Sequence, residues 1–310
     1  MKYKIRKLSF ILLLSIINKS GWSCINEYRA LLDGRIAETG GFDGIPAGKY
    51  DYVDKQHLLK LLSKSDSTYK ASGKTEDYSD YGAMLVYNGI YNEAKEVFQN
   101  IEVSSPGLYA TASNLGTVYE LLGENDSAYF WISKAIKLNP NSHEGSEWIH
   151  LKILEAKIKS KGIPDYFVTH SILSLNFGDK EKPENLSNID LELLRTQLYY
   201  QLNERITFVK PKDLIVGQLL FDLGNINAIT IDVKAGIKAY ELAKKYGYKS
   251  TILSKREKHF ESLQSKAEFK DKVESWLIDN LTAVGITVLI CLILIAIFIM
   301  KRIKSRRSEK

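Results

Sequence analysis

The feature that most constrains this chain is a set of identical residues that recur at one fixed spacing. Four pairs are each separated by 34 residues: Gly82 and Gly116, Gly89 and Gly123, Ala94 and Ala128, and Pro106 and Pro140. A period of this length is typical of stacked units that each contain two packed elements. One such unit cannot bury its apolar face alone, so neighbouring units must share a continuous core.

With these residue types, the period resembles the tetratricopeptide repeat family. In the unit 109–142 six residues match the family's pattern: Leu115, Gly116, Tyr119, Ala128, Ala135 and Pro140. The unit 75–108 carries Gly82, Ala94 and Pro106 at the equivalent places. The resemblance implies two antiparallel helices per unit, with Gly82 against Ala94 and Gly116 against Ala128 at the crossings. A proline then ends each second helix.

Beyond residue 142 the pattern weakens. Residues 143–157 have the spacing of a third first helix, and 214–246 has the pattern of another helix pair with Gly224 and Gly236 at crossing positions. We therefore expect roughly one and a half to two irregular units over 143–250. Segments 114–120, 142–150 and 221–225 also resemble a group of uncharacterised bacterial exported repeat proteins, which implies an envelope location but no activity.

The N-terminal 23 residues have the pattern of a cleavable signal peptide. A basic start is followed by the apolar run 8–17, which is too short for a bilayer core of about 30 Å, and then by small residues. An uncleaved anchor is the alternative. Cys24 at the border raises the possibility of lipidation, although Trp22 fits that reading poorly.

Residues 281–300 are predicted to form one transmembrane helix. They carry no charge and would be about 30 Å long as a helix, which matches a hydrocarbon core. The basic tail 301–310 places the C-terminus in the cytoplasm. The N-terminal domain is then exported, and periplasmic if the source is bacterial.

The net charge of +6 belongs to these two ends. Residues 1–23 hold 5 basic residues and no acid, and 301–310 hold 6 basic residues and one acid, which leaves 32 basic against 36 acidic residues between them. A nucleic-acid binder would carry its positive charge on the folded domain, so we expect no nucleic-acid partner.

Between the ends and the repeats lie two less regular segments. Residues 24–74 are predicted to form a loop followed by a helix that caps the first repeat. Residues 251–280 are predicted to form juxtamembrane helices that lead to the membrane span, with Trp276 near the interface.

No pattern in the sequence supports catalysis, and we expect neither a cofactor nor a metal. His143, Glu147 and His150 would share one face of a helix and could offer three ligands, but their spacing is not the usual metalloprotease pattern. Ser67 and Lys70 fit a serine–lysine motif whose remaining parts are missing. The simpler interpretation of the first group is an exposed helix face within a repeat, or packing of His150. The second pattern occurs by chance in most lysine-rich chains.

The resemblance also implies a concave groove lined by the first helix of each unit. The groove positions that it assigns are Glu76, Ser79, Tyr87, Ser113, Thr117, Glu120, Glu144 and Glu147. Residues 75–142 carry 3 basic and 9 acidic residues, so a neutral or basic partner is favoured over an acidic peptide.

These observations predict an all-α tetratricopeptide-type helical repeat solenoid with irregular C-terminal units and one C-terminal transmembrane helix. The predicted function is a membrane-anchored exported scaffold that binds another protein or a peptide segment through the groove. The alternative is the partner- or ligand-sensing subunit of an envelope signalling system that lacks its own kinase domain.

Overall fold

The computed structural model describes residues 27–39, 44–48 and 54–308. The predicted signal peptide, 1–23, and Cys24 lie outside the described residues. The chain divides into two compact units: the first includes residues 267–308, and the second includes residues 54–266. Each is described by itself below.

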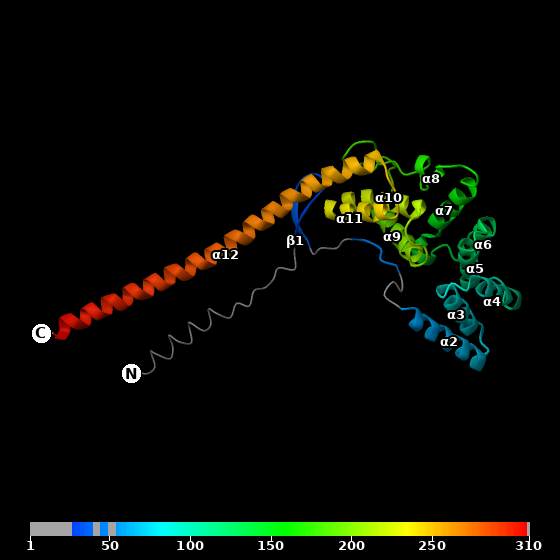
Figure 1. The fold of residues 1–310 in the computed structure, drawn as a ribbon, viewed down its shortest axis with the longest axis horizontal. Coiled ribbons are helices and arrows are strands. Elements are labelled where there is room, and N and C mark those ends of the chain that lie inside the picture. Colours follow the sequence, from blue (N-terminus) through cyan, green and yellow to red (C-terminus); the bar gives the residue numbers. More distant parts are fainter. Residues whose placement is uncertain (1–26, 40–43, 49–53, 309–310) are drawn as a thin grey trace. The chain divides into compact units, whose positions relative to one another are not determined.

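The two predicted repeats of 75–142 are present as two helical hairpins. Helices α3 (Thr75–Tyr87) and α4 (Tyr91–Ser104) are followed by α5 (Tyr109–Leu121) and α6 (Asn125–Leu138). The starts of α3 and α5, and those of α4 and α6, are 34 residues apart. Each helix packs on the next along the chain, as Figure 1 shows. An all-α repeat fold is therefore confirmed over this segment.

The crossings are close, as predicted. A Cβ atom on Gly116 would lie 2.4 Å from Ile132 Cδ1, and one on Gly82 would lie 2.8 Å from Phe98 Cζ. The atoms nearest to each glycine thus belong to a large side chain one turn beyond the predicted alanine, Ala94 or Ala128, on the second helix. Both alanines are fully buried nearby.

The predicted third first helix begins later than expected. A short 3-10 segment, η1 (Ser142–Gly145), precedes α7 (Glu147–Lys159). His143 and Glu144 have φ of 53° and 58°, so neither belongs to that helix. The one-turn α8 (Tyr166–Thr169) and a long connection follow in place of a regular second helix.

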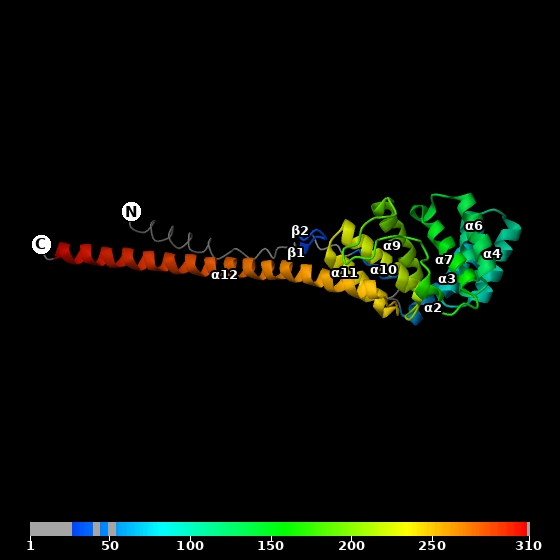
Figure 2. The ribbon, with the colours of Figure 1, turned by 90° about the horizontal axis from the view of Figure 1, so that it is seen from above.

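The C-terminal helices of the second unit form a second apolar core. They are α9 (Leu191–Phe208), α10 (Leu214–Thr230) and α11 (Val233–Lys245), and Figure 2 shows them beside one another. Asp190, Asp213 and Asp232 each accept a backbone hydrogen bond at the helix start, as N-cap residues do. The predicted crossing is present, since a Cβ on Gly224 would lie 3.2 Å from Gly236 O.

The N-terminal segment contains elements that the sequence analysis did not predict. Strands β1 (Glu27–Ala30) and β2 (Ile36–Thr39) form a two-stranded sheet. The predicted capping helix is α2 (Lys55–Ser72), which begins after the N-cap Asp54 and packs against α3. It covers the first repeat with half-buried side chains such as Leu62.

Helix α12 runs without a break over Thr251–Ser308, so the predicted separate juxtamembrane helices are one helix with the predicted span. Its first turns bury Leu253 and Phe260 within the second unit. Further along, in the first unit, Lys270 Nζ lies 4.6 Å from the ring centre of Tyr28. By length and composition α12 is a candidate to cross a membrane, with a window of mean hydropathy 3.1 that is not buried.

The crossing at Gly116 gives a first prediction. Gly116→Ala should destabilise the full chain by about 1–3 kcal/mol, because the new Cβ overpacks against Ile132. Ile132→Ala removes the two side-chain atoms nearest to the new Cβ, so the loss in the double variant should be smaller than the sum of the two single losses. Chemical denaturation of the two single variants and the double variant measures the coupling. Additive losses would show that the crossing is wrongly placed.

Candidate functional site

Two of the residues predicted to line the groove, Tyr87 and Glu120, contact helix α9 of the same chain. The ring of Tyr87 in α3 stacks on Phe208 in α9 at 5.3 Å between centroids. Glu120 in α5 is ion-paired with Arg205 in α9 at 2.6 Å. Ahead of α7, Ser146 Oγ accepts a hydrogen bond from Gln201 of α9 at 3.0 Å. Helix α9 therefore contacts the first helices of both repeats and the residue that precedes α7.

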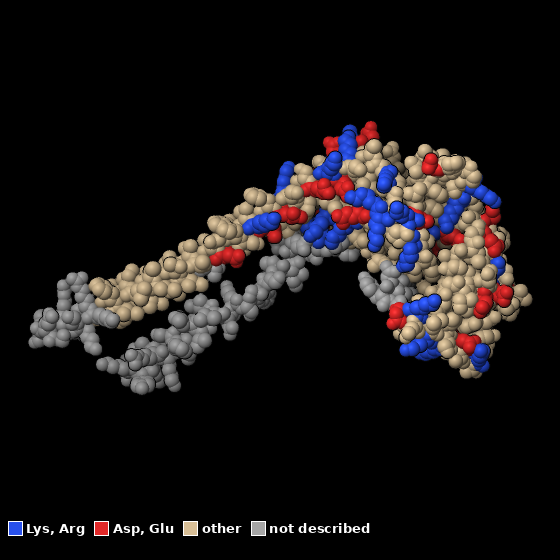
Figure 3. Space-filling view, viewed as in Figure 1, with Lys and Arg blue, Asp and Glu red and all other residues tan. Residues whose placement is uncertain are grey.

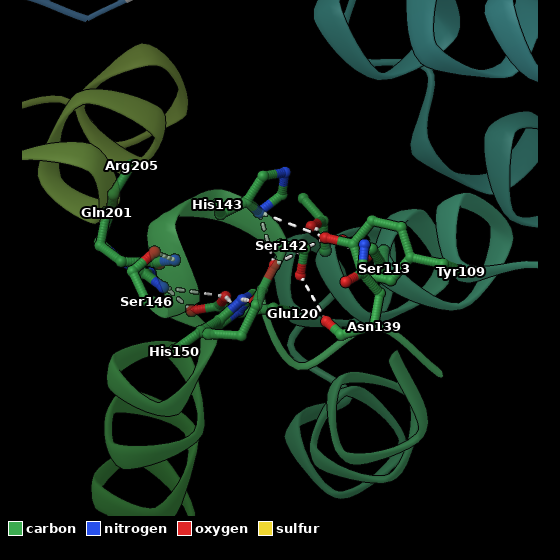
Figure 4. Close-up of polar contacts among 12 residues, drawn as sticks. Tyr109, Ser113, Glu120, Asn139, Ser142, His143, Ser146, His150, Gln201 and Arg205 are labelled. Carbon is green, nitrogen blue, oxygen red and sulfur yellow. Dashed lines mark hydrogen bonds and ion pairs between the residues drawn. The ribbon is translucent and has the colours of Figure 1, made fainter. Parts of the chain in front are cut away.

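Glu120 is the centre of a buried group of charges, shown in part in Figure 4. Its carboxylate receives Arg205 Nη1, Lys157 Nζ and His150 Nε2, each at 2.6 Å. We call Glu120, His150, Lys157 and Arg205 the Glu120 cluster. It joins α5, α7 and α9 through charge-assisted hydrogen bonds, which are stronger than neutral ones.

Burial and charge compete within the Glu120 cluster. Although burial opposes its ionisation, Arg205 and His150 hold the pKa of Glu120 well below its usual value. Burial also disfavours protonated His150, yet the carboxylate of Glu120 raises the pKa of that imidazole above its usual value. The cluster is therefore stable as a set of ions, because each buried charge has a partner.

A second carboxylate, Glu147, extends this network. Its Oε1 lies 2.6 Å from His143 Nδ1, and its Oε2 lies 3.6 Å from His150 Nδ1. Tyr109 also donates to it at 3.3 Å. Against the effect of burial, the bonds from the two histidines lower the pKa of Glu147 to about 2.

The structure thus brings together the three residues weighed as metal ligands, but in a different arrangement. His143 precedes α7 and stacks on Tyr200 of α9 at 4.8 Å, and both ring nitrogens of His150 face carboxylates. No group of three His, Cys, Asp or Glu side chains placed to hold a metal ion occurs in the described part of the chain.

A pocket of about 260 Å³ remains between the first helices and α9. Tyr87, Ser113, Thr117 and Glu147 of the predicted groove line it. Helix α9 contributes Tyr200, Glu204 and Phe208, and Asn114 of α5 is a further polar wall residue. Arg205 and the imidazoles of His143 and His150 also line it, so the pocket combines aromatic rings and neutral polar groups with side chains of both charges.

The remaining predicted groove residues lie elsewhere. Glu120 is buried in its cluster and is not part of the pocket wall, Glu76 and Glu144 are exposed, and Ser79 is half-buried outside the pocket. Ser67 and Lys70 lie on α2, where Lys70 pairs with Asp66 at 2.7 Å. These placements do not test a binding role, so the role of the groove residues stays a prediction.

The sequence analysis missed the contribution of α9. Gln201 is buried and the side chain of Arg205 is 9% exposed, and both fall on the same helical stripe as Leu198 and Leu202. A charged residue on an apolar helix stripe needs a buried counter-charge. The position of Arg205 on such a stripe is therefore the sequence feature that could have indicated an ion pair. Nothing in the sequence indicates that the counter-charge is Glu120, 85 residues earlier.

No protein-family model matches the sequence, and no curated protein matches it. Among solved structures, a tetratricopeptide repeat protein from Parabacteroides merdae is similar with a TM-score of 0.33 and 15% sequence identity. The match covers 68% of this chain and 95% of that chain. The repeat architecture of residues 75–138 follows from the helix boundaries described above.

The pKa of His150 gives a second prediction. Its raised value in the folded chain stabilises the fold fully below the usual histidine pKa of about 6.5, and this contribution is lost as pH rises through the folded value. Stability should therefore fall as pH rises from about 6.5, and His150→Gln should flatten that decline. Denaturant titrations at several pH values measure the slope.

The control for this experiment is His57→Gln, which changes an exposed histidine of α2. It should keep the slope of the unchanged chain. An equal slope in the His150→Gln chain would contradict a charged His150 within the Glu120 cluster.

Proposed function

We propose that this chain is a non-catalytic, membrane-anchored scaffold whose exported helical domain binds another protein or a peptide segment. Residues 281–300 would form the anchor, and the C-terminus would lie in the cytoplasm. The support for the anchor is the apolar stretch of α12 together with the basic residues that follow it. The repeat architecture supports binding, because stacked helices present extended surfaces of this kind.

The pocket between the first helices and α9 is the observation that carries the proposal. Its volume of about 260 Å³ is smaller than the ~300–1,000 Å³ of typical small-molecule sites and far too small for a helix. It fits a projecting side chain of a partner. Tyr87 and Phe208 supply aromatic area, and Asn114 and Thr117 supply hydrogen-bonding groups at the wall.

The charge of the site favours a neutral or basic partner residue. Glu147 and Glu204 line the pocket, and acidic side chains lie at the surface of the repeats in Figure 3. The charge of Glu120 is already compensated within its cluster. We assign contact with a basic side chain to Glu147 and Glu204, because these two carboxylates line the pocket and Glu120 does not.

One observation favours a second function, that of a partner-sensing subunit in envelope signalling. Helix α12 is continuous from residues buried in the helical domain, such as Phe260, to the candidate membrane span. A continuous helix is an element that could couple binding in the domain to a cytoplasmic partner. The scaffold remains the main proposal because it requires no further component.

Topology gives a third prediction. A reporter enzyme that is active only outside the cytoplasm should function when fused after Lys270 and fail when fused after Lys310, because a charged tail of this kind stays on the inner side. Enzyme activity in intact cells measures both fusions. Activity of both, or of neither, would contradict the proposed arrangement.

Partner capture gives a fourth prediction. A photo-crosslinking residue at Thr117 should capture the partner in cells, whereas one at Phe130, which is 61% exposed on α6, should not. With the captured protein purified, Tyr87→Ala should weaken binding by about 2 kcal/mol if this ring is a hot spot. Tyr87→Phe should bind nearly normally, since it keeps the ring that stacks on Phe208.

The matched control is Phe130→Ala, which removes an exposed aromatic side chain from a second helix. It should leave binding unchanged. Loss of binding with Phe130→Ala and none with Tyr87→Ala would place the partner on the opposite face of the repeats and overturn the pocket proposal.

A further inference from the structure

A second pocket lies under the connection between α8 and α9, far along the chain from the repeats. Two buried side chains hold this connection against the C-terminal helices. Gln218 of α10 accepts from Ile172 N at 2.7 Å and donates to His170 O at 2.9 Å. Arg256 of α12 donates to Phe177 O at 2.8 Å and to Gly178 O at 2.7 Å.

The pocket has a volume of about 210 Å³. Its wall includes Thr169, His170, Phe177, Phe221, Asp222 and Tyr248, together with Gln218 and Arg256. The rings of Phe221 and Tyr248 stack at 5.2 Å between centroids. We call this the Asp222 pocket.

The Asp222 carboxyl is the unusual group in this wall. It follows Gln218 by one helical turn on α10, so the two side chains share a face of that helix. Its side chain is 5% exposed, and Oδ2 has no hydrogen-bond partner among the residues that the structure describes. Gln218 and Arg256 use their polar atoms to hold the connection, but Asp222 does not.

Ionising a buried carboxyl that has no hydrogen-bond partner costs free energy, so the pKa of Asp222 is raised. Burial raises the pKa of Asp222 to about 8, against the opposing charge of Arg256. The other titratable groups near it are Tyr240 of α11 and, in the pocket wall, Tyr248 and His170. Without a donor, the carboxyl is largely protonated at neutral pH.

We propose that the Asp222 pocket binds a small molecule through a protonated primary amino group, which donates its hydrogen bonds to the Asp222 carboxylate. An ammonium group supplies several donors and the compensating charge that the carboxyl lacks. Phe221 and Tyr248 give the pocket wall apolar area for the carbon skeleton attached to the ammonium group.

Charge balance supports a cationic ligand in spite of Arg256. The guanidinium of Arg256 interacts with two carboxylates, Asp222 and Asp179, and also donates to Asn225 Oδ1 at 2.7 Å. With both carboxylates ionised, one further positive charge makes the group neutral. A ligand that carries only a hydroxyl would leave Asp222 protonated and would gain less from the site.

The ligand's ammonium group and the proton of Asp222 compete for the same carboxylate, and this competition provides the test. We expect calorimetry on the full chain to detect binding of at least one of methylamine, benzylamine and phenethylamine. The affinity for the amine should rise about tenfold per pH unit between about pH 6 and about pH 8. Below about pH 8, each amine that binds should release about one proton from Asp222. The alcohols with the same carbon skeletons should bind at least about tenfold more weakly.

Asp222→Asn keeps the shape of the side chain and should abolish both amine binding and its pH dependence. Asp126→Asn removes an exposed carboxylate from α6 and should change neither. If Asp222→Asn fails to fold, the pH dependence of binding and the proton release of the unchanged chain still test the proposal.

The proposal is overturned if no amine binds at about millimolar concentration, if the alcohols bind equally well, or if the affinity for the amine does not depend on pH. Because this pocket shares no residue with the pocket at Tyr87, failure here leaves the partner-binding proposal intact.

Discussion

The arrangement of the second unit depends on the buried ion pairs of Glu120. Its carboxylate connects a repeat helix, α5, to α7 and to α9, which lie 30 to 85 residues further along the chain. Two buried ions cost several kcal/mol of desolvation each, and their attraction offsets this only when every partner is present. The pairs with Arg205, His150 and Lys157 meet that condition. Removing Glu120 alone would leave buried cations without a counter-ion, which is why its role is first structural and only then, through the position of α9, functional.

This constraint changes what the groove of the repeats can do. In the sequence-based prediction the first helices present an open surface, with Tyr87, Glu120 and Glu147 available to a partner. In the structure α9 lies against all three of the elements concerned, and its side chains share the wall of the remaining pocket. The acidic residues therefore have different surroundings: Glu120 is ion-paired within its cluster, Glu147 pairs with His143 and His150 at the pocket wall, and Glu204 lines the pocket. Under the proposed function, a partner would insert a side chain between two helices and would not lie along an open groove.

The sequence predicts local features of this fold well and its long-range contacts poorly. The helix boundaries of 75–138 follow from the spacing of glycine, alanine and proline, because crossings and helix ends depend on residues within one repeat. The glycine of each crossing is predicted correctly, but the large side chain that lies nearest to it, such as Phe98 at Gly82, is not predicted. The pairing of Glu120 with Arg205 had no such signal, because tertiary contacts between distant helices leave no periodic pattern. The sequence likewise does not indicate that Asp222 Oδ2 lacks a hydrogen-bond partner, because this depends on the groups around it in the fold.

The energetics of the Glu120 cluster also determine how a partner can enter. Displacing α9 would separate Arg205 from Glu120 and expose the apolar stripe of Leu198 and Leu202. Breaking a buried ion pair costs on the order of 3–5 kcal/mol. Exposing each leucine to water adds the free energy that its burial contributes. A partner that binds with micromolar affinity gains only about 8 kcal/mol of binding free energy in total. It could therefore rarely offset the cost of displacing α9. Under the proposed function, a partner would therefore bind beside α9, where the rings of Phe208 and Tyr87 stack, and would not displace that helix.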